Sequence, residues 1–177
     1  MDAIIGTGKI SKREYGIISE RNILVPMNDG VKVNVNIFRP DGKGKFPALV
    51  GMAPFHLDYQ DDYIWPSAAR SARVRGSPSV NIESTPRDFF VRRGYVKVTG
   101  ASRGTGKSEG VYQYTCAREI QDIYDLIEWT AKQPWCDGNV GMAGIAYYAA
   151  LEPEVAALQP PHLKTIAPIA AFWDDYR

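Results

Sequence analysis

Residues 141–149 read GMAGIAYYA, a short apolar strand followed by a turn and the start of a helix. In the motif G-x-S-x-G, this order of elements places a nucleophilic serine at a strained turn. Gly144 matches the first glycine, so Ala146 takes the nucleophile position, and a methyl group cannot attack a carbonyl. The last glycine falls on Tyr148, with the small Ala149 one place later. On the motif alone, an ordinary strand-to-helix turn is an equal alternative.

Strands and helices alternate along the chain on both sides of this turn. We predict strands at 15–27, 31–38, 46–54, 95–99, 139–143 and 163–171, and helices at 86–93, 117–133 and 147–158. Asp29 and Gly30 join the first two strands and are a strong hairpin signal. We therefore expect an α/β fold with a mostly parallel sheet and an N-terminal antiparallel hairpin.

A second glycine motif, ASRGTGKS at residues 101–108, resembles the end of a phosphate-binding loop. Ala101 replaces the first glycine of that loop, and Glu109-Gly110 follows where a helix should begin. We therefore favour a glycine-rich turn, with Arg103 anchoring it by hydrogen bonds, and expect neither a nucleotide nor another cofactor.

Residues 56–85 are polar and irregular, and we predict a long loop insertion there. It contains His56 and the acidic residues Asp58, Asp61 and Asp62, which favour a solvated surface over a metal site. We expect no metal. The aromatic residues of this segment either cover a substrate pocket or pack the loop; they are Tyr59, Tyr63 and Trp65.

Length and charge set limits on the kind of protein. The 177 residues correspond to a single domain, and a formal charge of +1 gives no reason to expect nucleic acid or an anionic membrane as partner. No apolar run is long enough for a membrane span, and the first residues lack the apolar region of a signal peptide. We expect a soluble, cytoplasmic protein.

Several further motifs, taken in order, resemble one family. They are DGV at 29–31, RPDG at 39–42, FP at 46–47, RRGY at 92–95, RGTGKSEG at 103–110, EW at 128–129, QPWCDGNVGM at 133–142 and PPHLK at 160–164. This pattern is similar to the cocaine esterase/NonD family. That family includes X-prolyl dipeptidyl aminopeptidase-like α/β-hydrolases and α-amino-acid ester hydrolases.

The resemblance implies a catalytic site from which this sequence departs. In the family a serine stands where Ala146 is found, and a tyrosine of the oxyanion hole aligns with Phe55. The backbone N–H of Tyr147 is the oxyanion donor that remains. His56 and Tyr147, together with Tyr59 and Trp65, are the candidate substrate-binding residues.

The resemblance also implies that the chain, residues 1–177, is the N-terminal part of one α/β-hydrolase domain, with the later strands missing. The family's triad Asp and His come later, and His162 lies in a turn that the family uses structurally. We expect a second polypeptide that supplies the C-terminal half of the fold, or self-association. The function expected is that of a repurposed or split hydrolase that binds a small acyl or polycyclic molecule without hydrolysis. The alternative is a fragment of an ordinary serine esterase inactivated by a Ser-to-Ala change.

Overall fold

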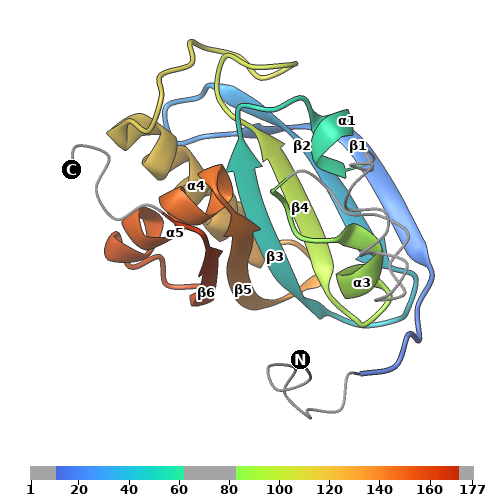
Figure 1. The fold of residues 1–177 in the computed structure, drawn as a ribbon. Coiled ribbons are helices and arrows are strands. Elements are labelled where there is room, and N and C mark those ends of the chain that lie inside the picture. The colour runs from blue at the N-terminus through green and yellow to red at the C-terminus, as the bar shows by residue number, and fades with distance from the viewer. Residues whose placement is uncertain (1–10, 62–82, 172–177) are drawn as a thin grey trace.

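The computed structural model describes residues 11–61 and 83–171, and it places six strands in one sheet with the order β1-β2-β4-β3-β5-β6 (Figure 1). The strands are β1 (Ile17–Pro26), β2 (Lys32–Pro40), β3 (Phe46–Ala53), β4 (Val96–Ala101), β5 (Cys136–Ile145) and β6 (Leu163–Ile169). β1, β2 and β4 pair antiparallel, whereas β4, β3, β5 and β6 pair parallel. The predicted α/β fold with an opening hairpin is thereby confirmed.

The hairpin between β1 and β2 closes at Gly30. Its φ of 87° lies in the left-handed region, where glycine has no steric penalty. The N–H of Met27 donates to the carbonyl of Val31 at 2.9 Å, which sets the register of the two strands.

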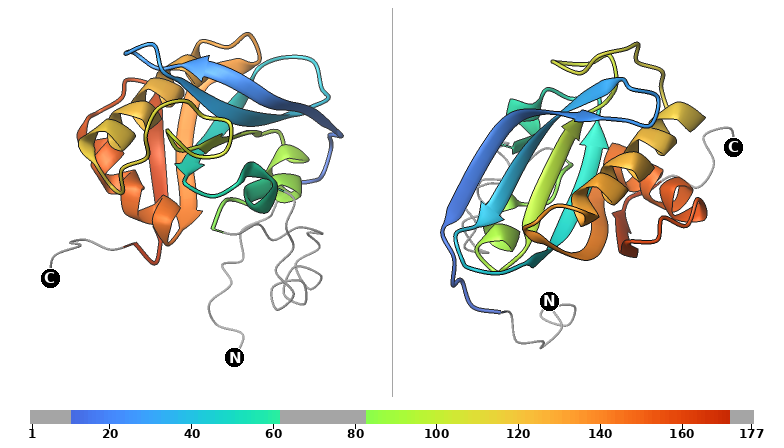
Figure 2. Two further views of the ribbon diagram at one scale, coloured as in Figure 1. Left: turned by 90° about the horizontal axis from the view of Figure 1, so that it is seen from above. Right: turned by 180° about the vertical axis from the view of Figure 1, so that it is seen from behind.

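The longest helix, α4 (Ala117–Ala131), covers β3 and β5 and contacts α5 (Tyr147–Ala157). Figures 1 and 2 show α4 on the opposite face of the sheet from the two short helices α1 (Leu57–Asp61) and α3 (Arg87–Val91). Of the residues whose helical spacing predicts one apolar face of α4, Ile120, Ile123 and Ile127 are buried in the core, together with Leu126. Tyr124 and Ala131, predicted on the same face, are half-buried. Among the described residues, no helix has the length and apolar character needed to cross a membrane.

The segment predicted as a long polar loop contains ordered structure at both of its described ends. Residues 57–61 form α1, and Ser84 makes an isolated antiparallel bridge with Gly144. Asp61 is fully buried rather than solvated, because Lys97 lies 3.2 Å away and Thr99 donates to it at 2.8 Å. The prediction of a solvated acidic surface is therefore wrong for Asp61. Asp62, Tyr63 and Trp65 lie outside the described residues.

Two predicted boundaries need correction as well. The helix α3 begins at Arg87 with Pro86 as its N-cap, one residue later than Thr85 and Pro86 suggest. The strand β5 begins at Cys136, three residues before the predicted start. Helix α5 runs through Pro153, a residue that fits poorly beyond the first turn of a helix.

The glycine-rich segment after β4 is a turn whose backbone donors are used within the protein. Gly104 donates to the carbonyl of Glu109 at 2.9 Å, and Ser108 donates to that of Thr105 at 2.9 Å. Arg103 donates two hydrogen bonds of 2.8 Å to Asp122 of α4. This anchoring confirms the structural role predicted for Arg103.

Glu152 is the most unusual buried group of α5. Its side chain is 1% exposed; one carboxyl oxygen accepts from the N–H of Ala167 in β6 at 2.9 Å. The other carboxyl oxygen has no hydrogen-bond partner among the described residues. Burial raises the pKa of this carboxyl from 4.5 to about 7.

The raised pKa of Glu152 predicts a pH-dependent stability. A carboxyl that binds its proton more tightly when folded stabilises the protein at low pH. The free energy of unfolding should therefore fall by about 3 kcal/mol as the pH rises from about 4.5 to about 7. In denaturant unfolding across this range, Glu152→Gln should make the decline smaller by this amount, whereas the exposed Glu154→Gln should leave it unchanged. An unchanged decline in Glu152→Gln would contradict the assignment.

Candidate active site at the β5–α5 turn

The turn between β5 and α5 consists of one residue, Ala146, in a strained conformation. Its φ of 54° and ψ of −110° lie where residues with a Cβ are rarely found. Gly144 makes the tight approach of strand and helix possible, because a Cβ there would collide with Cβ of Tyr148 and lie 3.2 Å from the carbonyl oxygen of Glu83. The turn therefore projects the side chain of residue 146 from the carboxyl end of the sheet.

Backbone hydrogen bonds from three directions hold the turn. Ile145 donates to the carbonyl of Glu83 at 2.8 Å, and Ala146 donates to that of Ile169 in β6 at 3.1 Å. The carbonyl of Ala146 accepts the first bond of helix α5, from Ala150 at 2.8 Å. These bonds stabilise the positive φ against its steric cost.

The first N–H of α5 belongs to Tyr147 and has no acceptor within the helix. It donates instead to a carboxyl oxygen of Glu83 at 3.1 Å. Ala146, the N-cap residue, carries no oxygen that could cap the helix, so Glu83 supplies that acceptor from a distant part of the chain. Partial burial raises the pKa of the Glu83 carboxyl, and the hydrogen bond from Tyr147 opposes this rise.

The side chain of Tyr147 is tied to α4 through Glu119. The phenol donates to one oxygen of Glu119 at 2.7 Å, and Ser102 donates to the other at 2.7 Å. The hydroxyl of Tyr112 lies 2.9 Å from that of Tyr147. Burial raises the pKa of Glu119, which is 4% exposed, although both donors counteract the rise. Burial likewise raises the pKa of Tyr147, so this phenol is neutral.

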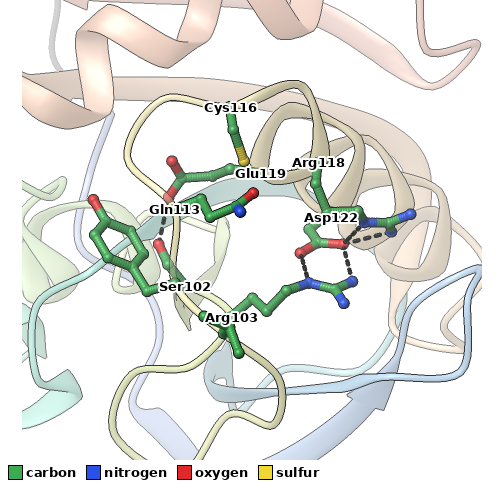
Figure 3. Close-up of a pocket in the computed structure, with 9 residues that line it drawn as sticks. Ser102, Arg103, Gln113, Cys116, Arg118, Glu119 and Asp122 are labelled. Carbon is green, nitrogen blue, oxygen red and sulfur yellow. Dashed lines mark hydrogen bonds and ion pairs between the residues drawn. The ribbon is translucent and has the colours of Figure 1, made fainter.

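A cavity of about 230 Å³ lies beside this network (Figure 3). Its lining residues come from the turn after β4 and from the start of α4; they are Ser102, Arg103, Val111, Tyr112, Gln113, Cys116, Arg118, Glu119 and Asp122. Figure 3 shows Arg103 and Arg118 both bound to Asp122, so the two cations on this wall are paired. Ser102, Tyr112 and Glu119 line the cavity and also belong to the hydrogen-bond network of Tyr147. These hydrogen bonds therefore connect the wall of the cavity to the residue next to the turn.

The structure brings some of the predicted site residues together and separates others. The ring of Phe55 lies edge-on to that of Tyr147, with 6.1 Å between their centroids, so the side chains of these two predicted site residues are neighbours. His56 lines a different, polar cavity of about 300 Å³ between β2 and the turn after β4. Tyr59 is 53% exposed and lines neither cavity. Trp65 lies outside the described residues.

His162 has a structural partner, as its position in the PPHLK turn predicts. Its Nδ1 lies 2.8 Å from a carboxyl oxygen of Glu128, and its backbone N–H contacts the other oxygen at 3.2 Å. In the described ranges, no cluster of three His, Cys, Asp or Glu side chains could hold a metal ion.

Sequence reasoning missed the two carboxylates that contact Tyr147. Glu119 is an acidic residue in the first turn of a helix, a place where such residues are common for electrostatic reasons alone. Glu83 lies in a polar segment with no periodicity, 64 residues from its partner. Only the tertiary structure shows that both converge on one residue.

The strained turn between a parallel strand and a helix, at the carboxyl end of a sheet opened by a hairpin, is that of an α/β hydrolase. Residues 29–177 match the model of the X-Pro dipeptidyl-peptidase (S15 family). The chain therefore belongs to this family, which confirms the resemblance seen in its motifs.

Curated proteins and solved structures agree with this assignment. The chain is 36% identical over 163 residues to cocaine esterase of Rhodococcus sp. (strain MB1 Bresler), an alignment that covers 92% of this chain and 25% of the relative. It is 34% identical to a putative Xaa-Pro dipeptidyl-peptidase of Bacillus anthracis, covering 84% of this chain and 28% of the relative. A CocE/NonD family hydrolase from Staphylococcus aureus superposes with a TM-score of 0.78 at 38% identity, covering 91% of this chain and 29% of that one. The chain thus spans about a quarter of the length of these relatives.

The positive φ predicts that glycine is tolerated at residue 146 better than elsewhere on α5. Ala150→Gly should lower the free energy of unfolding by about 0.5–1 kcal/mol, the usual cost inside a helix. Ala146→Gly carries the same entropic cost but removes the Cβ clash of the left-handed region, so it should be more stable than Ala150→Gly by about 1–2 kcal/mol. Urea unfolding of both variants measures this difference. Equal losses would show that Ala146 is not strained.

Proposed function

We propose that this chain forms the N-terminal part of a serine-hydrolase fold in which Ala146 occupies the nucleophile position, so that the site binds an acyl compound without hydrolysing it. The observation that carries this proposal is the strained turn of Ala146 itself. The turn keeps the conformation in which the family presents a reactive hydroxyl, but its side chain is a methyl group. Loss of the nucleophile alone costs a triad enzyme about a millionfold in rate.

A second departure supports natural repurposing over a single inactivating change. Phe55 packs against Tyr147 where the family's oxyanion tyrosine aligns, and a phenyl ring has no hydrogen-bond donor. One donor is left to an acyl oxygen at this position, the backbone N–H of Tyr147. A pocket with this donor still orients a carbonyl and can guide a non-hydrolytic reaction by holding its ligand in one geometry.

The ligand proposed for this site is a small acyl or polycyclic molecule. The aromatic rings around the turn supply apolar contact area, since Phe55 and Tyr114 both lie edge-on to Tyr147. These contacts call for neither a metal nor an organic cofactor.

We further propose that a second polypeptide covers the edge strand β6. Ile169 in this strand is 58% exposed, and β6 has a strand partner, β5, on one side within the described sheet. An open edge of this kind pairs readily with another strand. Self-association and further sequence in the same polypeptide are the other ways of covering it, and the mass of the native assembly distinguishes the three.

The alternative function is that of an ordinary serine esterase or acyl-peptidase, of which this chain is a fragment inactivated by a Ser-to-Ala change. The names of the relatives, an esterase and a dipeptidyl-peptidase, support this alternative. It predicts a reactive site as soon as the hydroxyl is restored within the full-length protein.

Ester hydrolysis by Ala146→Ser, in the native assembly that contains this chain, separates the two functions. The proposed function predicts no hydrolysis of 4-nitrophenyl acetate before or after the substitution, in an assembly whose intact mass includes a second chain. Ala150→Ser, one turn along the same helix, serves as the matched control. Esterase activity restored by Ala146→Ser but not by Ala150→Ser, in a single longer polypeptide, would contradict the proposal and establish the alternative.

A further inference from the structure

The segment that begins at Glu83 is fixed against the turn from two sides. On one side, Ile145 donates to the carbonyl of Glu83 at 2.8 Å, and Ser84 bridges Gly144. On the other, the hydroxyl of Ser84 donates to the carbonyl of Gln60 in α1 at 2.6 Å and accepts from Lys97 at 3.0 Å. The position of Glu83 is therefore set by backbone pairing and by a buried lysine, not by its own side chain.

The buried charges beneath this segment are compensated. The ammonium group of Lys97 is 3.2 Å from Asp61, and the side chains of these residues are 2% and 0% exposed. Breaking such a pair leaves an uncompensated buried charge, which is strongly unfavourable. The buried pair of Lys97 and Asp61 therefore fixes Ser84, to which Lys97 donates. Ser84 in turn holds the neighbouring Glu83 next to the turn.

The conformation of Glu83 directs its carboxylate at the start of α5. Its φ of 56° is strained for a residue with a side chain. In this conformation one carboxyl oxygen reaches the N–H of Tyr147 at 3.1 Å, while the carbonyl of the same residue accepts from Ile145. The negative charge also lies at the positive end of the helix dipole, which strengthens the contact.

Resting on the function proposed above, we propose that Glu83 is an autoinhibitory residue: its carboxylate occupies the Tyr147 N–H, and an acyl oxygen must displace it to bind. The N–H that would receive a ligand's carbonyl is already engaged by an oxygen of the chain itself. Binding of an acyl compound therefore includes the cost of breaking a charge-assisted hydrogen bond. An anionic ligand is additionally repelled by the displaced carboxylate, so Glu83 also sets specificity against anions.

Acetate binding to the full chain tests this proposal, because acetate is a small acyl anion and needs no hydrolysis. The backbone amide resonance of Tyr147 in a ¹⁵N-labelled sample reports on the site. Glu83→Asn suits the positive φ, and its shorter, uncharged side chain does not reach the N–H. This variant should bind acetate about tenfold more tightly than the parent, with the Tyr147 resonance shifting on titration. Sodium chloride at equal ionic strength controls for screening.

Two further variants keep the result interpretable. Glu83→Gly removes the carboxylate and relieves the positive φ, so it should behave as Glu83→Asn does if the fold is retained. Glu154→Gln removes an exposed carboxylate from α5 and should bind acetate as the parent does. Equal acetate affinity in the parent and both Glu83 variants, or a Tyr147 resonance that does not respond in them, would overturn the proposal. Restored hydrolysis in Ala146→Ser would overturn the proposed function without affecting this result.

Discussion

The architecture of the site depends on one backbone constraint, the positive φ of Ala146 between β5 and α5. A residue with a Cβ adopts this conformation only where the surroundings enforce it. Here the carbonyl of Ile169 in β6 accepts a hydrogen bond from the N–H of Ala146, and the carbonyl of Glu83 accepts one from the N–H of Ile145. Gly144 must lack a side chain for the helix to begin this close to the strand. These contacts hold the backbone of the turn in place without using the side chain of residue 146.

The hydrogen bonds of Tyr147 connect this turn to other elements of the fold. Its backbone contacts Glu83, while its phenol contacts Glu119 at the start of α4. Ser102, the first residue after β4, completes the link through its hydrogen bond to Glu119. One residue next to the turn thus joins β4, α4 and the segment after α1. A substitution at Glu119 would consequently remove a hydrogen bond that positions Tyr147 next to the turn, although no hydrogen bond joins Glu119 to residue 146 itself.

Much of the fold could be predicted from the sequence because its elements follow local rules. The apolar spacing of α4 and the Asp29-Gly30 turn both correspond to the observed structure. The strained turn could be located by its glycine and by the family resemblance. Local rules fail for Asp61, whose neighbours in sequence are polar, because its burial is set by Lys97 on β4. They fail for Glu83 for the same reason, since its partner lies on another element.

The most direct test of the account is whether the turn binds an ester and leaves it intact. Titration of the ¹⁵N-labelled chain with 4-nitrophenyl acetate measures both events in one sample. The amide resonance of Tyr147 follows binding, and the absorbance of 4-nitrophenol follows cleavage. The account predicts that the resonance shifts while nitrophenol is released no faster than in buffer. Release at an accelerated rate, or a Tyr147 resonance that does not move at saturating ester, would contradict it.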